Sequence, residues 1–454
     1  MSVILIISVI LKGIGAALEI LIQIAITRAI GVSGFGTYSA WISASELMLW
    51  CLFSGIIKCN TFYLPKRGAT IGTFSRKYFL FYVLPMLAAG ASAAILLGHG
   101  ELLPVFVITL LLLLVQDRSS TFMARRRAKQ ALFGEYVLGR VLMLAGLLVL
   151  FHFGKGEMRA IVWLYALQCL LVVLYFLAQR CGPEQPATET KVSLRKWASF
   201  QRGDVVQSFI GQVPVLLPFF FVGAFEAGVV SIVLLVKRLI NFISGPTAKV
   251  FLPEFSRLYQ KNDRQGIRET FASIMRIQMM FVSPLAVVLV GFPRAILRIL
   301  APELVGHAGL FVMCAVVFLF AATLGPCGGV MQMTGSERRD NLFREIALAV
   351  MLLVFLTMRK NPYFVLYGLC VQTLLEAGGK YAYVCRWMEK APVTLLRYLG
   401  WWIVPAALTL TAYLLKIGDS LMLMAAFAAI AFAVRVRREL KDEGLLKQML
   451  RTNR

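Results

Sequence analysis

The sequence predicts an all-α, polytopic membrane protein with about 14 transmembrane helices, arranged as two pseudo-symmetric six-helix lobes plus two extra C-terminal helices. Hydrophobic residues make up 59% of the chain and charged residues only 15%, whereas about 25% of the residues of a soluble domain are charged. Apolar runs of about 20 residues, the length that crosses a bilayer, follow one another along the chain. A glycine pattern near the start also recurs near the middle, which indicates two copies of one membrane unit.

The apolar runs define the expected spans and domains. They lie near residues 3–27, 38–57, 78–98, 102–122, 132–152, 160–179, 203–222, 228–248, 274–292, 308–330, 342–358, 362–384, 398–415 and 419–434. We therefore expect an N-terminal lobe over residues 1–180, a cytoplasmic linker with an interfacial helix over 181–202, a C-terminal lobe over 203–384, two additional helices over 385–434 and a basic cytoplasmic tail over 435–454.

The internal repeat has two parts. Gly31, Gly36 and Ser39 match Gly223, Gly228 and Ser231, each 192 positions later and each after a long apolar stretch. Met123, Leu132, Phe133 and Glu135 match Met333, Leu342, Phe343 and Glu345, each 210 positions later. Paired repeats of this kind are typical of transporters.

The placement of the positive charge predicts the topology. The net charge is +24, and 35 of the 47 lysine and arginine residues fall in alternate connections and the C-terminal tail, with Arg344 and Lys380 among them. This bias predicts that those connections and both termini are cytoplasmic. It also accounts for the basic composition without nucleic-acid binding.

Several kinds of chemistry have no support in the sequence. There is no phosphate-binding G-x-x-x-x-G-K-[ST] motif, which argues against ATP hydrolysis by this chain. The three histidines, His99, His152 and His307, are far apart, and the eight cysteines form no C-x-x-C pair, so we expect neither a metal nor a cofactor. A membrane-embedded polysaccharide polymerase or glycosyltransferase is the enzymatic alternative, but the longest expected outer connection, residues 293–307, is too short to fold alone. We therefore expect a protein that is not an enzyme.

Ionisable residues inside the expected spans are candidates for function because each costs at least about 2.5 kcal/mol at mid-bilayer. They are Lys12, Glu19, Glu46, Arg140, Asp204, Lys237, Arg238 and Glu376. Lys237 and Arg238 are adjacent on a helix and point about 100° apart, so one carboxylate cannot satisfy both. Glu19, Glu46 and Asp204 are the expected sites for a coupling proton or cation. The alternative is that these charges pair with one another and only hold the helices together.

Two expected spans at matching positions of the repeats contain residues that favour bending. The seventh span carries Pro214 and Pro218, which remove helical hydrogen bonds, and the first span carries Gly13 and Gly15. Such pairs are common hinges for alternating access, although tolerated proline in a packed membrane helix is an equally good interpretation.

The motifs over residues 28–38, 222–231 and 326–339 resemble those of a known family. They are similar to the polysaccharide and O-antigen repeat-unit flippases of the multidrug/oligosaccharidyl-lipid/polysaccharide exporter superfamily. The resemblance covers the first 12 expected spans. It implies a monomeric, V-shaped bundle of two lobes in the bacterial cytoplasmic membrane, which passes a polyprenyl-diphosphate-linked oligosaccharide between leaflets by alternating access and is driven by protons or sodium.

Within this resemblance, we expect Lys12, Lys237, Arg238 and Arg140 to bind the diphosphate. Gly31 and Tyr38 are expected to shape the turn into the second span. The alternative within the superfamily is a cation-coupled multidrug antiporter, whose cavity should be acidic and aromatic, whereas the charges within these spans are balanced to basic.

Overall fold

The computed structural model describes residues 2–63, 72–124, 127–154, 156–179, 194–358, 361 and 363–389. All regular structure in these ranges is helical. Seven helices of this part of the chain are long and apolar enough to cross a membrane by length and composition. The prediction of an all-α polytopic fold is therefore confirmed. The spans expected near residues 398–415 and 419–434, and the basic tail, lie outside the described residues.

The chain forms two compact units, which we describe separately. The first unit extends from Val3 to Ser231 and the second from Ile232 onward, so that the boundary falls inside helix α9 (Ala224–Gln260). The linker and lobe boundaries expected from the sequence remain predictions, and residues 180–193 lie outside the described part.

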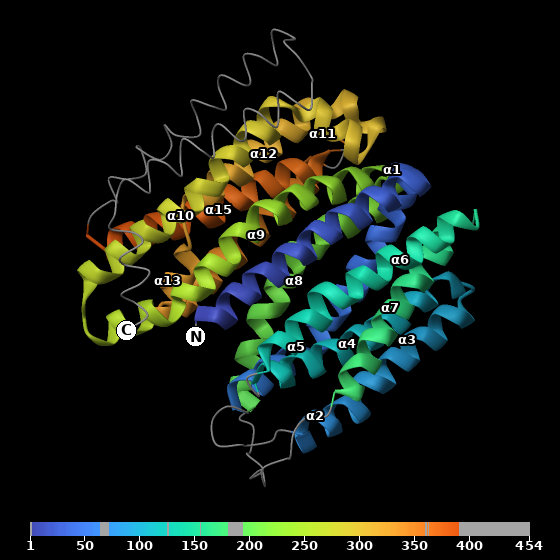
Figure 1. The fold of residues 1–454 in the computed structure, drawn as a ribbon, viewed down its shortest axis with the longest axis horizontal. Coiled ribbons are helices and arrows are strands. Elements are labelled where there is room, and N and C mark those ends of the chain that lie inside the picture. The colour runs from blue at the N-terminus through green and yellow to red at the C-terminus, as the bar shows by residue number, and fades with distance from the viewer. Residues whose placement is uncertain are drawn as a thin grey trace. The chain divides into compact units, whose positions relative to one another are not determined.

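The first unit is a bundle of long apolar helices (Figure 1). Its elements are α1 (Ser2–Tyr63), α2 (Gly72–Tyr78), η1 (Phe79–Val83), α3 (Leu84–Leu96), η2 (Gly100–Leu102), α4 (Leu103–Ala124), α5 (Ala128–Leu132), η3 (Phe133–Leu138), α6 (Gly139–His152), α7 (Met158–Ala178), α8 (Leu194–Phe221) and the start of α9. Helix α4 packs against α3 and α7, and α7 also packs against α6.

Helix α1 contains both of the first two expected spans, joined at a break. Gly31 has φ 70° and ψ 176°, a conformation outside the helical region. A residue with a Cβ rarely adopts this φ, so glycine is required here. The nearby Tyr38 is 8% exposed and packs against Phe35 and Tyr165. The structure thus places Gly31 at the turn between the two spans.

Helix α8 joins the core of the first unit at its N-terminal end. A buried cluster there includes Phe53 and Ile56 of α1, and Trp197 and Phe200 of α8 pack against it. Gln201 inserts into the hydrogen-bond ladder of α1, because its amide donates to Trp50 O (2.9 Å) and Cys51 O (2.5 Å) and accepts from Gly55 N (2.6 Å). In a regular helix, Gly55 N would donate to Cys51 O four residues earlier. Here both groups bond to the Gln201 amide instead, so the ladder of α1 is interrupted at this point.

The second unit contains the remainder of α9, α10 (Arg264–Gly291), α11 (Pro293–Leu300), η4 (Pro302–His307), α12 (Ala308–Thr323), α13 (Cys327–Met333), α14 (Glu337–Thr357) and α15 (Phe364–Trp387). Helix α15 packs against both α14 and α12, and α12 packs against α10 (Figure 1). Asp263 caps α10 by accepting a hydrogen bond from Gly266 N at 2.8 Å. Helices α10, α12 and α15 line a cavity.

Candidate functional site

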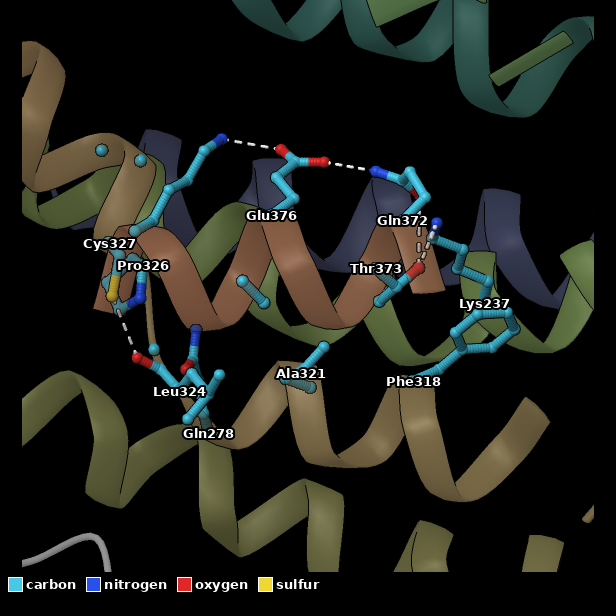
Figure 2. A pocket seen from close by; sticks show the side chains of 16 residues that line it. Lys237, Gln278, Phe318, Ala321, Leu324, Pro326, Cys327, Gln372, Thr373 and Glu376 are labelled. Carbon is cyan, nitrogen blue, oxygen red and sulfur yellow. Dashed lines mark hydrogen bonds and ion pairs between the residues drawn. The ribbon is translucent and has the colours of Figure 1, made fainter. Parts of the chain in front are cut away.

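A cavity of about 390 Å³ lies within the second unit. Residues of α9, α10, α12, α13 and α15 line it, together with the short connection between α12 and α13. Figure 2 shows the side chains of Lys237, Gln278, Gln372, Thr373 and Glu376 around it. Most binding sites for small molecules are cavities of this kind, with volumes of about 300–1,000 Å³ and a few polar groups on an apolar wall.

Lys237 provides a cation at the cavity wall. Its Nζ donates to Thr373 Oγ1 at 3.2 Å and lies 5.2 Å from the centre of the Phe318 ring. Among the residues that the structure describes, no carboxylate forms an ion pair with Lys237. An ammonium group has three donors, so Lys237 keeps donors for a further acceptor.

A directed hydrogen-bond chain runs from Lys237 along α15 (Figure 2). The Thr373 hydroxyl donates to Gln372 Oε1 at 3.3 Å, and Gln372 Nε2 donates to Glu376 Oε2 at 2.6 Å. Lys380 Nζ donates to Glu376 Oε1 at 2.7 Å. The chain therefore links the ammonium of Lys237 to the carboxylate of Glu376 through one hydroxyl and one amide.

Glu376 and Lys380 belong to a charge quartet that joins α14 to α15, with Asp340 and Arg344 as the other members; Asp340 and Lys380 are buried, and Arg344 and Glu376 are half-buried. Asp340 pairs with Lys380 at 2.8 Å and with Arg344 at 3.0 Å, and Arg344 lies 3.7 Å from Glu376. The side chains of Asp340 and Lys380 are 1% and 7% exposed. Two cations balance two carboxylates in the quartet, so adding Lys237 leaves an excess of one positive charge around the cavity.

Gln278 of α10 lines the cavity from another helix and is 2% exposed. Its Oε1 has no hydrogen-bond partner, and its amide forms no hydrogen bond with any residue that the structure describes. Most buried polar groups in proteins are paired, so an unpaired amide at a cavity wall requires an explanation.

Arg140 lies in the first unit, where the sequence left pairing and substrate binding open. Its Nε and Nη2 both lie 2.8 Å from Glu19 Oε2, and its Nη1 donates to the carbonyl oxygens of Glu135 and Tyr136, each at 3.1 Å. These carbonyls belong to the π-helical segment η3. Four of the five donors of a guanidinium group are thus used inside the protein.

The other two carboxylates expected to couple ions also have partners in the first unit. Glu46 accepts a hydrogen bond from Gln212 Nε2. Asp204 Oδ1 lies 2.5 Å from Lys58 Nζ, and the Asp204 side chain is 16% exposed. Each of these contacts joins the second half of α1 to α8.

The four cations that we expected to bind the substrate lie in different surroundings. Lys237 lines the cavity, whereas its neighbour Arg238 is exposed and is not among the lining residues. Arg140 is joined to Glu19. Lys12 belongs to α1, and its side chain lies outside the described part.

Sequence reasoning missed Gln278 and the members of the quartet other than Glu376. Arg344 and Lys380 were expected in cytoplasmic connections, but they lie in α14 and α15 and face Asp340 and Glu376. The usable signal was the spacing of Asp340 with Arg344 and of Glu376 with Lys380, since opposite charges four residues apart meet on one helical face.

In comparisons with known proteins, the chain matches solved structures. No family model and no curated protein matches the chain. An inward-facing multidrug resistance MATE family transporter of the MOP superfamily matches with TM-score 0.62 and 11% identity, over 84% of this chain and 98% of that one. The lipid II flippase MurJ in an inward closed conformation matches with TM-score 0.59 and 12% identity, over 97% of this chain and 98% of that one.

A third similar structure is a MOP superfamily transporter from Pyrococcus furiosus, for which the reverse polarity of the binding pocket suggests a different function. It matches with TM-score 0.55 and 13% identity, over 86% of this chain and 96% of that one. The chain therefore has the fold of MOP superfamily transporters and is a multi-pass membrane protein. The superfamily-level resemblance is confirmed for the fold, and the polysaccharide flippase family remains a prediction.

Proposed function

We propose that the protein is a flippase that passes a polyprenyl-diphosphate-linked oligosaccharide, a precursor of cell-surface polysaccharide, across the bacterial cytoplasmic membrane by alternating access. The main support is the ammonium of Lys237, which lines a cavity without a carboxylate partner among the described residues. A half-buried cation of this kind favours an anionic ligand, because a ligand phosphate would supply the missing opposite charge.

The extent of the structural matches also supports a flippase. The match to lipid II flippase MurJ covers 97% of this chain, whereas the matches to the inward-facing MATE transporter and the Pyrococcus furiosus transporter cover 84% and 86%. The likeness to a lipid II flippase thus extends over more of the chain.

We assign the cations to the substrate and the carboxylates to the coupling ion. Lys237 and Arg238 bind the diphosphate, with Lys12 and Arg140 contributing in another state of the transport cycle. Glu19, Glu46 and Asp204 bind the coupling proton or sodium ion. Glu19 is linked to Arg140, so a proton on Glu19 would release Arg140 for the substrate. Both termini are proposed to be cytoplasmic, with the protein acting as a monomer.

The second candidate function is a cation-coupled multidrug antiporter, which the TM-score of 0.62 to the MATE transporter favours. Such a protein would bind organic cations, and an excess positive charge at the cavity opposes this. An enzymatic role as a polymerase or glycosyltransferase has no match among the structures reported above.

One experiment separates the two transport functions. The gene is deleted in the native host, and both the surface polysaccharide and the resistance to ethidium are measured. A flippase predicts loss of the polysaccharide, accumulation of its lipid-linked precursor on the cytoplasmic side and unchanged ethidium resistance. Normal polysaccharide with increased ethidium sensitivity would contradict the proposal and favour the antiporter.

A further inference from the structure

We infer that the cavity of the second unit is a subsite for one phosphorylated sugar, and that Gln278 is the residue that distinguishes this sugar from phosphate alone. The inference rests on the proposed function and specifies its substrate: the cavity binds the sugar next to the diphosphate, while Lys237 binds the phosphate. It depends on three features of the described residues, which are the size of the cavity, the position of its cation and the unpaired amide.

The cavity has room because many of its lining residues have small side chains. They are Ala321, Ala322, Gly325, Gly328, Gly329 and Ala377. These residues come from α12, α13, α15 and the connection before α13, so the space does not depend on one helix. The volume of about 390 Å³ lies within the range of small-molecule sites.

The unpaired amide of Gln278 predicts the chemistry of the ligand. A carboxamide offers one acceptor oxygen and two donor hydrogens, and a hydroxyl group can both donate to the oxygen and accept from the nitrogen. Leaving such a group buried and unpaired is unfavourable, because it has lost its hydrogen bonds to water and gained none in the protein. The doubly ionised phosphate group of a sugar phosphate has acceptor oxygens alone and cannot satisfy Gln278 Oε1. Inorganic phosphate near neutral pH carries one or two P–OH donors, whereas a sugar adds several hydroxyl groups that can reach Gln278 while the phosphate stays on Lys237.

The two polar groups of the wall are complementary to two parts of one ligand. Lys237 of α9 keeps donors for an anion, and Gln278 of α10 requires a hydroxyl. Both residues line the same cavity. A sugar phosphate carries an anion and hydroxyl groups on adjacent atoms, whereas an organic cation or a lipid tail provides neither.

Gln278 is also well placed to discriminate between ligands. A site that uses a buried polar group to bind a substrate hydroxyl rejects analogues without that hydroxyl strongly, because the protein group is then left unpaired. Glu376 and Gln372, in contrast, are already hydrogen-bonded to each other and contribute less to this selection.

The test measures ligand binding to the purified full-length protein in detergent by isothermal titration calorimetry. The probes are glucose 1-phosphate, galactose 1-phosphate, N-acetylglucosamine 1-phosphate and inorganic phosphate. We expect at least one sugar phosphate to bind about tenfold or more tightly than inorganic phosphate. In Gln278→Leu this preference disappears while the affinity for inorganic phosphate stays the same.

Gln265→Leu is the matched control, because Gln265 lies on the same helix and is exposed, where it bonds Glu269; it should keep the preference. Gln278→Met, with an unbranched apolar chain of the same length, replaces Gln278→Leu if the leucine variant fails to fold. Lys237→Gln should weaken the binding of every phosphate-containing probe.

Two outcomes would overturn the inference. The first is that no sugar phosphate binds more tightly than inorganic phosphate, as expected if a trapped water satisfies Gln278. The second is that the preference persists in both Gln278 variants. In either case, the Lys237→Gln variant decides whether the proposed function is affected. If this variant binds phosphate more weakly, the proposed function stands and only the sugar subsite is rejected. If this variant binds phosphate as tightly as the unchanged protein, the proposed function loses its main support as well.

Discussion

Gly36 and Gly228, which occupy equivalent positions of the two sequence repeats, pack against each other's helix in a reciprocal contact. A Cβ atom added to Gly36 would overlap Ala224 O and lie 2.6 Å from Gly228 N, and one added to Gly228 would overlap Val32 O. Val32 and Ala224 are themselves 192 positions apart, as are the two glycines. The repeat seen in the sequence thus has a direct counterpart in the packing.

The glycine contact predicts a loss of stability in Gly36→Ala and Gly228→Ala. In each variant the new methyl group overlaps a backbone carbonyl oxygen, which cannot move as a flexible side chain can. We expect a cost of about 1–3 kcal/mol per substitution, the usual range for overpacking. Thermal unfolding in detergent measures this, with Gly211→Ala as the control because a Cβ there meets nothing within 4 Å. Equal melting temperatures for Gly36→Ala and Gly211→Ala would contradict the contact.

The charge quartet predicts that Asp340→Asn destabilises the second unit strongly, because Asp340 and Lys380 are buried. The substitution leaves Lys380, whose side chain is 7% exposed, with one carboxylate in place of two. Removing one partner of a buried pair costs about 3–5 kcal/mol. The comparison is Glu101→Gln, which breaks the exposed pair of Glu101 with Arg159 and should cost less than about 1 kcal/mol.

A double variant tests whether the cost comes from the pairing. Asp340→Asn combined with Lys380→Met removes both charges of the pair, so it should recover part of the stability lost in the single variant. If the two substitutions instead lower the melting temperature additively, Asp340 and Lys380 do not form the pair described.

The contact between Arg140 and Glu19 predicts an energetic coupling within the first unit. A double-mutant cycle with Arg140→Met and Glu19→Gln should give a coupling of about 1 kcal/mol, a modest value because the side chains are 25% and 31% exposed. Urea or thermal unfolding of the four proteins measures the cycle. A coupling near zero would show that the two side chains do not stabilise each other, and would leave Arg140 available as a substrate-binding residue.

The sequence predicted the helices and the turns between them because these depend on local composition. Gly31 is an example, since its position between two apolar runs already indicated a turn, and its φ of 70° requires glycine. The repeat likewise indicated that Gly36 and Gly228 are equivalent. Their reciprocal contact could not be predicted, because it depends on how distant helices meet.

The same limit applies to the candidate site. Arg140 and Glu19 are 121 residues apart, and no local pattern indicates that they pair. Lys237 was recognisable as a charge inside a span, but its partner Thr373 lies 136 residues away. Gln278 gave no signal, because a lone glutamine in an apolar helix is recognised as unusual only when its surroundings are known.

The most direct test of the central claim is the lipid-linked sugar exported by cells that carry Lys237→Gln together with Arg238→Gln as their sole copy of the protein. The account predicts that the variant is inserted in the membrane at normal levels, that surface polysaccharide is lost and that its lipid-linked precursor accumulates on the cytoplasmic side. Lys261→Gln, which changes an exposed lysine in the turn between α9 and α10, should export normally. Normal surface polysaccharide in the double variant would contradict the assignment of these cations to the substrate.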